Sequence, residues 1–429
     1  MLELGKGMEC FITHQMDTQH NQPTPRSRIA PAKVLLPLGL GTALSLMGDA
    51  TLYTVLPTHA AEAGITLAAV GIILSANRLI RLFLNGPAGV AYDRSPRRRL
   101  FIPALLIGAI STAVYAATSG FWPLLAGRLL WGLAWSGIWV GGATIILDVS
   151  SDQDRGRWTG LYQTWFFLGA ALGAILGGWL TDEWGYSTAM WIGASLTAFG
   201  AIIAFFSLPE TRPPEDRGNP NSQETVNEKW RPNFEFYGVI TLNGINRFIT
   251  AGVLAATLAL LVQDQLLKTN LILGVATVTG VLFGLRTILS MFAAPLSGTL
   301  SDRLDNRWGV TTGVLLIGAI GMLLLVSSNF VIILIGICFT AVAGGSTQAL
   351  MTTRTGDLVD LAQRGKAIGS LHTAGDLGSA LGPITAYALL GWLSLNGLFL
   401  MCAVLFALGA CLAGLIYIRQ RTFSSKPLN

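Results

Sequence analysis

The chain is poor in charge, and this excludes most soluble folds. Only 12% of its 429 residues are Asp, Glu, Lys or Arg, whereas 52% are apolar. A soluble domain carries about a quarter charged residues, and one globular core cannot bury this much apolar side chain. The composition therefore predicts a polytopic membrane protein. Its 50 glycines fit this class, because helices in lipid associate through small residues.

Sequence motifs typical of enzymes are also missing. The sequence has no H-E-x-x-H, G-x-S-x-G or G-K-[ST] pattern, and three of its four histidines lie outside the apolar runs. The cysteines show neither paired nor metal-type spacing, which indicates small hydrophobic residues rather than disulfides: Cys10, Cys338, Cys402 and Cys411. We expect no enzyme, catalytic residue, cofactor, metal site or nucleic-acid partner.

Twelve apolar runs are long enough to cross about 30 Å of hydrocarbon. They fall in two sets of six, at about 34–57, 66–91, 100–118, 121–147, 158–181 and 187–208, and at about 236–262, 270–300, 309–327, 330–352, 365–391 and 393–418. This pattern predicts an all-α membrane protein of two six-helix halves. We expect a disordered tail at 1–33, halves at 34–208 and 236–418, a linker at 209–235 and a second tail at 419–429.

Basic residues lie almost entirely on one side of these runs. Of the 28 Lys and Arg residues, 22 fall in the tails, the linker or the connectors that follow even-numbered runs. Five lie inside runs, and Lys268 lies in a connector on the other side. Since Lys and Arg mark the cytoplasmic side, we expect a bacterial inner-membrane protein with both termini in the cytoplasm.

An internal repeat relates the two halves. "GVAYDR" at 89–94 recurs as "GTLSDR" at 298–303, 209 residues later. The same offset relates other pairs: Asp148 and Asp357, Arg155 and Arg364, Gly160 and Gly369, Gly169 and Gly378, and Gly173 and Gly382. One register over four consecutive runs indicates two parallel repeats, an organisation found in transporters.

Several motifs resemble those of the major facilitator superfamily, over residues 34–418. The family's turn G-x-x-x-D-R-x-G-R-[RK] is matched by Gly89, Asp93, Arg94, Arg97 and Arg98, with Pro96 in place of its second glycine. "GRLLWGLAW" at 127–135 resembles the motif of the fourth span, and "LPET" at 208–211 the end of the sixth. "GAALGAILGGWL" at 169–180 and "GDLGSALGP" at 375–383 are similar to the glycine-rich motif of the drug–proton antiporter branch.

The resemblance implies a gate at the basic turns. Asp93 would face the N-terminus of the run 365–391 across the halves, where the partial positive charge of a helix favours a carboxylate, and Arg97 would bridge to Asp148. Such a latch favours the outward-open state. Its candidate residues are Gly89, Asp93, Arg94, Arg97, Asp148, Gly298, Asp302 and Arg303. The alternative is a turn whose arginines serve only topology.

Charges at membrane depth are costly and therefore functional candidates. Asp49 and Arg128 lie at equal depth, about eight residues from the outer ends of their runs at ~1.5 Å per residue. In the family's arrangement they form a pair in the cavity, which serves proton coupling or only structure. Arg81 and Asp376, near the midplane, would pair across the halves as a structural or gating contact rather than a ligand site.

The substrate cavity has candidates in both halves. Arg247 would face it as an unpaired cation, or be satisfied by backbone carbonyls or the neighbouring Asn243. Trp131, Trp135 and Trp139 share a helix face with Arg128 and either line the cavity or pack ordinarily. His372 lies one turn from Asp376 and is either a titrating group or a packed histidine.

We predict a monomeric secondary active transporter that rocks its halves about a midplane site. The favoured mode is proton-coupled efflux of small organic compounds, with Asp49 as the proton carrier. Apolar neighbours favour its neutral form and Arg128 its carboxylate, so a cavity that opens alternately changes the balance. The alternatives are proton-coupled uptake of an organic anion, which the excess arginine favours, and a non-transporting sensor.

Overall fold

A computed structural model describes residues 29–151, 154–212, 232–269, 274–359 and 363–424. Most of the expected tails and linker lies outside these residues. The first six spans are α2 (Pro31–Val55), α3 (Leu67–Arg94), α4 (Arg97–Ala117), α5 (Phe121–Val149), α6 (Arg155–Trp184) and α7 (Tyr186–Ser207). The seventh is continuous through α8 (Phe234–Arg247), the π-helix η2 (Phe248–Leu254) and α9 (Ala255–Thr269). The last five are α10 (Val275–Arg303), α11 (Arg307–Leu324), α12 (Phe330–Leu358), α13 (Arg364–Leu389) and α14 (Leu395–Ser424).

The predicted all-helical fold of twelve spans is confirmed. Eleven of the spans in the described residues are long and apolar enough to cross a membrane. The remaining one, α13, is less apolar because it carries polar groups such as Lys366, His372 and Asp376. The helix boundaries also follow the repeat, since α5 and α12 begin 209 residues apart and end 209 residues apart.

Local chemistry sets several of these boundaries. The side chains of Thr66, Asn306 and Asn329 each accept a hydrogen bond from a backbone N–H in the first turn of α3, α11 and α12, respectively. Between α3 and α4 only two residues remain, and Pro96 there has a φ of −55°. This value suits proline, so the replacement of the family's glycine leaves an unstrained turn.

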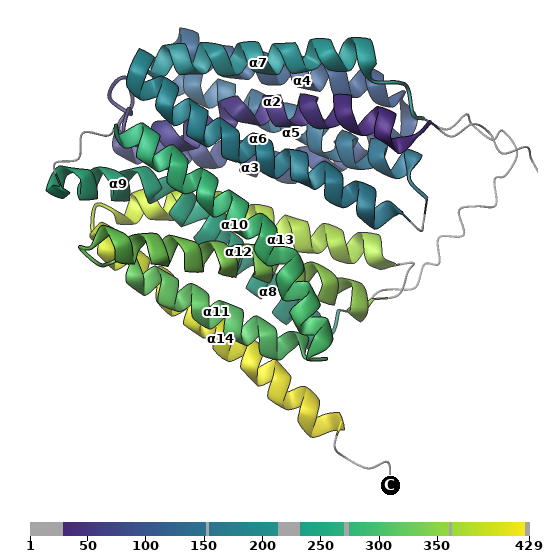
Figure 1. The fold of residues 1–429 in the computed structure, drawn as a ribbon, viewed down its shortest axis with the longest axis vertical. Coiled ribbons are helices and arrows are strands. Elements are labelled where there is room, and N and C mark those ends of the chain that lie inside the picture. Colours follow the sequence, from purple (N-terminus) through teal and green to yellow (C-terminus); the bar gives the residue numbers. More distant parts are fainter. Residues whose placement is uncertain (1–28, 152–153, 213–231, 270–273, 360–362, 425–429) are drawn as a thin grey trace, which may run out of the picture.

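The two sets of six helices lie side by side (Figure 1). In the first set α2 packs on α6 and α7, and α5 packs on α3 and α4; in the second, α11 packs on α12 and α14. Two helix pairs form most of the contact between the sets, α3 with α13 and α6 with α10. These four helices therefore form the interface that positions the site.

We distinguish two ends of the bundle by their turns. The basic side carries the turn at residues 94–99, and the opposite side carries the turns at 56–66 and 118–120. On the opposite side the halves touch through glycine: a Cβ on Gly71 of α3 would lie 2.7 Å from the carbonyl oxygen of Pro383 in α13. Gly178 of α6 likewise packs against the backbone of Ala276 in α10. The halves are closed at this end.

The basic side is open. A Cβ added at Gly86, Gly89, Gly298 or Gly369, in the corresponding parts of α3, α10 and α13, would meet no atom within 4 Å. We infer that the helices that touch at one end are apart at the other, so that the interior opens toward the basic side.

Gly71→Val tests this arrangement. The branched side chain cannot fit against the carbonyl of Pro383, so the variant should shift the protein toward closure of the basic side. We expect spin labels at Val90 and Lys366, both exposed, to move closer together in double electron–electron resonance. Gly313→Val is the control, because no atom lies near that glycine. Equal distance distributions in the two variants would contradict the closed interface.

Candidate functional site

Asp49 of α2 and Arg128 of α5 form an ion pair within the first half. Arg128 Nη1 lies 2.5 Å from Asp49 Oδ1. The arginine side chain is fully buried, whereas that of Asp49 is 15% exposed. The predicted contact is therefore present, and the carboxylate is the member that water reaches.

The aromatic ring of Tyr53 holds this pair in place. Its hydroxyl accepts a hydrogen bond from Arg128 Nη2 at 3.2 Å and donates one to the carbonyl of Leu74 at 2.9 Å. The guanidinium also lies over the ring, 5.2 Å from its centre, and Nε donates to the carbonyl of Ile73 at 3.3 Å. Arg128 is therefore held by several groups besides Asp49.

A second ion pair joins the halves. Arg81 Nη2 of α3 donates to both carboxylate oxygens of Asp376 in α13, at 2.7 and 2.9 Å. Asn85, one turn further along α3, adds a contact at 3.4 Å. The exposed fractions of the paired side chains are 14% and 9%. The predicted cross-half contact is present, at a point where α3 and α13 still touch.

Two further arginines bind the backbone of the π-helix, which the sequence analysis did not anticipate. Arg78 of α3 donates to the carbonyl of Ala251 at 2.6 Å and to that of Ser379 in α13 at 2.8 Å. Arg286 of α10 donates to the carbonyl of Thr250. The sequence showed both arginines at membrane depth but gave no signal for a π-helix, whose carbonyls are their acceptors. Arg78 thereby ties the first half to two helices of the second.

Arg247, the last residue of α8, is the least satisfied of the midplane arginines. It is half-buried, and its one hydrogen bond to a described residue runs from Nη1 to Gln348 Oε1 of α12 at 3.5 Å. Asn243 does not share this role: it is 4% exposed and donates to the carbonyl of Leu371 at 2.8 Å. In this conformation its amide joins α8 to α13, and a place for Asn243 in the cavity stays a prediction.

His372 is exposed rather than packed. It lies one turn before Asp376 on α13, and the charges of Asp376, Arg247 and Arg81 all act on it. The expectation of a packed histidine therefore fails. His372 is available as a polar group beside the midplane charges.

The tryptophans of α5 divide between core and surface. Trp131 and Trp135 are 1% and 6% exposed and stack at a centroid distance of 6.0 Å. They pack in the core of the first half, and Trp131 lies against Gly108 of α4. Of the two alternatives, ordinary packing is the one seen in this conformation, because Gly108 lets α4 approach Trp131 closely.

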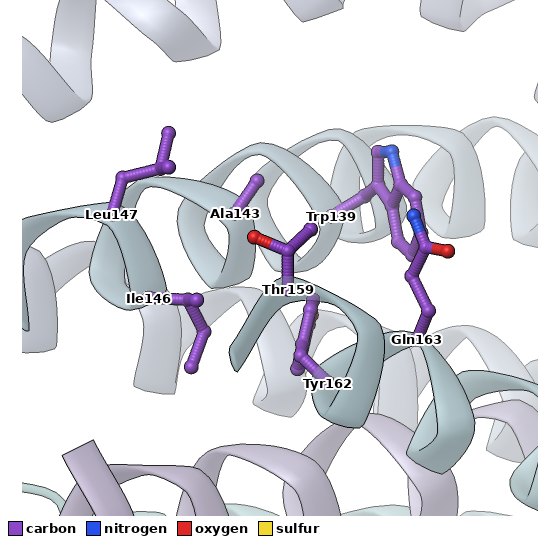
Figure 2. Close-up of a pocket in the computed structure, with 7 residues that line it drawn as sticks. All are labelled: Trp139, Ala143, Ile146, Leu147, Thr159, Tyr162 and Gln163. Atoms are coloured by element: carbon purple, nitrogen blue, oxygen red, sulfur yellow. The ribbon is translucent and has the colours of Figure 1, made fainter. Parts of the chain in front are cut away.

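Trp139 is half-buried and lines a pocket between α5 and α6 (Figure 2). Gln163 and Thr159 present polar groups to this pocket, and Tyr162, Ala143, Ile146 and Leu147 complete it. The space is about 350 Å³, including the part that is open to solvent. It lies in the half of α5 nearer the basic side, where the bundle is open.

The basic turn is braced inside the first half. Arg97 Nε lies 2.8 Å from Asp148 Oδ2, as predicted. Glu210, from the "LPET" segment, accepts hydrogen bonds from the backbone N–H groups of Arg97 and Arg98 at 2.8 and 3.2 Å. Its negative charge thus complements the N-terminus of α4, which gives the segment a physical role.

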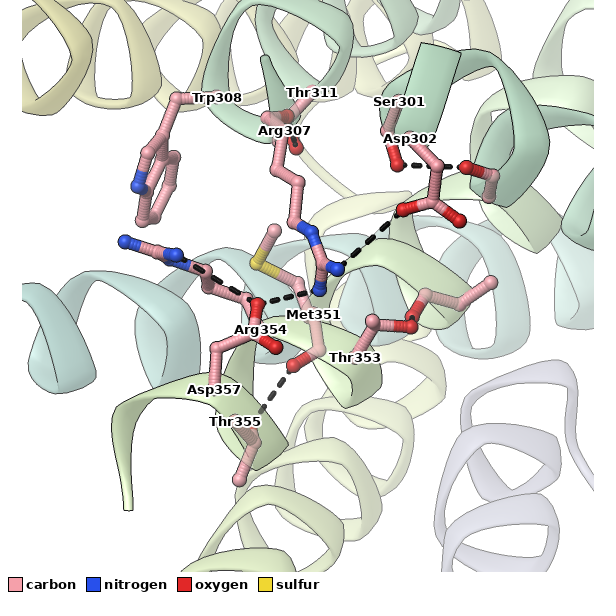
Figure 3. A network of polar contacts seen from close by, with 12 residues as sticks. Ser301, Asp302, Arg307, Trp308, Thr311, Met351, Thr353, Arg354, Thr355 and Asp357 are labelled. Carbon is pink, nitrogen blue, oxygen red and sulfur yellow. Dashed lines mark hydrogen bonds and ion pairs between the residues drawn. The ribbon is translucent and has the colours of Figure 1, made fainter. Parts of the chain in front are cut away.

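The corresponding turn of the second half carries a similar network (Figure 3). Arg307 pairs with Asp357, the counterpart of Asp148, and reaches Asp302 at 3.4 Å. Arg354 bonds Glu235 of α8 and lies 3.6 Å from Asp357. Arg303, like Arg94 in the first half, is exposed. Each half therefore fixes its own turn with an arginine and an aspartate.

A third turn on the basic side, before α6, is held by a carboxylate. Asp154 accepts hydrogen bonds from the hydroxyl of Ser151 at 2.6 Å and from the indole of Trp158 at 2.8 Å. The bond from Ser151, followed by that from Trp158, holds the pKa of this carboxyl below its usual range. These hydrogen bonds therefore favour the charged carboxylate of Asp154, which holds the turn together.

Asp93 differs from these anchored groups. It is exposed and forms no hydrogen bond or ion pair with any residue that the structure describes. The halves are apart here, so a latch to α13 would be released, and its role stays a prediction. We expect Asp93→Asn to lower the transport rate without lowering protein abundance, measured by flux and by immunoblot of membranes.

The matched control for this latch is Glu183→Gln. Glu183 is also an exposed carboxylate, but it lies near the C-terminal end of α6, on the side of the bundle opposite to Asp93. This variant should leave transport unchanged. Arg97 is less suitable as a probe, because it is buried against Asp148 and its loss would disturb the turn itself. Normal flux in Asp93→Asn would leave the turn with a topological role only.

Two helical repeats, closed at one end and open at the other around paired charges, define a membrane transporter. The Major Facilitator Superfamily profile matches residues 38–267 and 236–429, so the chain belongs to this superfamily. It is 24% identical to the class B tetracycline resistance protein of Escherichia coli over 382 residues, which cover 85% of this chain and 92% of that protein.

Solved structures show the same fold. A bacterial homologue of the human lysosomal transporter Spinster, inward-facing and unoccupied, aligns with a TM-score of 0.73 at 16% identity, covering 94% of this chain and all of that one (100%). The human organic anion transporter MFSD10 aligns with a TM-score of 0.64 at 19% identity, covering 91% and 100%. The protein is thus a multi-pass membrane transporter for a small molecule, not an enzyme.

Proposed function

We propose that the protein exports small organic compounds in exchange for protons. The observation that carries this proposal is the pair of Asp49 and Arg128, in which a partly exposed carboxylate contacts a fully buried guanidinium. A carboxylate that water reaches can accept a proton. An arginine held by Tyr53 and by Ile73 can remain in place while it does so.

The orientation follows from charge. The basic side, with the turn at 94–99, is the cytoplasmic side of a bacterial inner membrane by the positive-inside rule, which also places both termini in the cytoplasm. The structure is then inward-open. We further propose that one chain is the functional unit, since both halves of the interface come from the same chain.

The transport cycle follows from the state of Asp49. In the inward-open conformation its carboxylate is paired with Arg128, as expected after the proton has left to the cytoplasm. Substrate then binds, and the halves rock to open the other side. There Asp49 takes up a proton, loosens from Arg128 and favours substrate release. Downhill proton entry thereby drives export.

The substrate site that we propose spans the midplane and the pocket of α5 and α6. Arg247 supplies charge, and Trp139 with Tyr162 and Gln163 supplies an aromatic and polar wall. Such a lining suits an amphipathic compound with a flat ring system. The tetracycline resistance protein among the relatives supports the efflux mode.

The experiment uses purified protein in proteoliposomes with imposed pH gradients of each sign. Antiport predicts that a dye accumulates on the side of higher proton concentration, and that a proton-gradient collapser removes this accumulation. The second candidate is proton-coupled uptake of an organic anion, favoured by the four arginines near the midplane. It predicts accumulation on the opposite side. Absence of any flux would favour a sensor.

A further inference from the structure

The charges between the halves are strongly unbalanced. Four arginines from three helices lie close enough for their charges to interact: Arg78, Arg81, Arg247 and Arg286. The one carboxylate that acts on Arg247 in this group is Asp376. Asp49 is paired with Arg128 instead. The region around Asp376 therefore carries an excess of positive charge.

Three of these arginines have strong partners. Arg81 takes the carboxylate of Asp376. Arg78 and Arg286 take the carbonyls of Ala251 and Thr250, which belong to consecutive residues of the π-helix. These two guanidiniums therefore donate to backbone carbonyls of the π-helix rather than to a carboxylate.

Arg247 is the exception. Its hydrogen bond to Gln348 is 3.5 Å long, at the limit for such a contact, and Gln348 is itself exposed. Arg81 Nε and Arg286 Nε are buried and have no hydrogen-bond partner. No nitrogen of Arg247 is both buried and without a partner. Its remaining donors are therefore open to solvent and to a ligand.

We propose that Arg247 binds an anionic group of the substrate, such as a carboxylate. This inference rests on the proposed transport function and adds the charge class of the substrate. An unpaired cation at membrane depth is costly, and a guanidinium binds a carboxylate through two parallel hydrogen bonds. An anion here removes that cost and restores charge balance.

The surroundings of Arg247 fix its position. Gly375 of α13 packs closely against it, since a Cβ there would be 3.3 Å from Arg247 Cγ. His372 is exposed one turn earlier on the same helix. Asn243 is occupied by Leu371 and does not compete for the ligand. Gln348 of α12 contacts Arg247 of α8, so its side chain lies beside the position that the anion would occupy.

The sharpest test supplies the missing charge from within the protein. Gln348→Glu places a carboxylate where the amide oxygen already meets Arg247. Because Gln348 is exposed, the variant should fold with a thermal midpoint at or above that of the wild type. Its own carboxylate should then occupy Arg247 and displace an anionic ligand. Gln348→Ala is the matched control, because it removes the amide and leaves Arg247 free.

Two dyes with one ring system serve as probes: fluorescein, an anion, and tetramethylrhodamine methyl ester, a cation. Binding is measured by fluorescence polarisation with the protein in lipid nanodiscs and no proton gradient. Wild type and Gln348→Ala should prefer fluorescein. Gln348→Glu and Arg247→Gln should bind it about tenfold more weakly or worse, since hydrogen bonds to charged groups contribute about 1.5–3 kcal/mol.

The outcomes separate this inference from the proposed function. Fluorescein binding that persists unchanged in Gln348→Glu and Arg247→Gln, or that is absent in the wild type, would overturn the anion site. Loss of proton dependence in proteoliposomes, with the dye preference intact, would instead overturn antiport and leave the anion site standing. A wild type that prefers the cationic dye also contradicts the proposal.

Discussion

Removing Asp376 should destabilise the protein more than removing Arg81. Breaking a buried ion pair leaves one uncompensated charge and costs about 3–5 kcal/mol. In Asp376→Ala, Arg81 would remain near Arg78 and Arg247 without a counter-charge. In Arg81→Ala, Asp376 would still attract Arg247. The free energy of unfolding in detergent micelles should therefore fall more for Asp376→Ala.

The double variant, Arg81→Ala with Asp376→Ala, should be milder than the sum of the two single changes. A double-mutant cycle measures this difference as a coupling energy. Asp302→Ala serves as the comparison, because that carboxylate is 65% exposed and its contact with Arg307 is 3.4 Å. Its loss should cost below about 1 kcal/mol. Strictly additive losses for the midplane pair would show that Arg81 and Asp376 do not interact.

Asp49→Asn should abolish proton-driven transport and spare substrate binding. The substitution keeps the size of the side chain and a hydrogen-bond acceptor for Arg128, but it removes the group that can exchange a proton. Arg128 keeps its bonds to Tyr53 and to the carbonyl of Ile73, so the fold should survive. Downhill exchange of substrate should continue, because rocking of the halves does not require the proton.

The measurements are accumulation against a gradient and counterflow, both in proteoliposomes. Thr51→Ala is a control on the same helix, since its hydroxyl bonds the backbone of Met47 and of Gly173 rather than a charge. It should retain concentrative transport. Concentration of substrate by Asp49→Asn would disprove the assignment, and His372 and Asp376 would be the next candidates for the proton site.

Hydrophobic runs and the repeat predicted the fold well. Long apolar segments admit few structures in a bilayer, because every backbone polar group there must be bonded internally. This explains why all twelve spans were found and why α5 and α12 share boundaries at one offset. Regular helix rise also placed Asp49 and Arg128 at equal depth, and the helix arrangement of the family then predicted that they pair.

Tertiary packing decided what depth and periodicity left open. The face shared by Trp131, Trp135 and Arg128 was visible in the sequence, yet Gly108 and its neighbours on α4 bury the tryptophans in the core. Asn243 adjoins Arg247 in the chain, but its amide is taken by Leu371 of a different helix. Contacts of this kind depend on residues far away in the sequence.

By itself, the sequence determined the class of protein, the number of spans and the positions of the charges, since all three follow from local composition and regular helix geometry. Only the tertiary structure decided which charges remain without a strong partner. The π-helix in the seventh span satisfies Arg78 and Arg286 through the carbonyls of Ala251 and Thr250. A π-helix has no simple signature in amino-acid composition. Its carbonyls accept hydrogen bonds from Arg78 and Arg286, whereas Arg247 has only the long contact with Gln348.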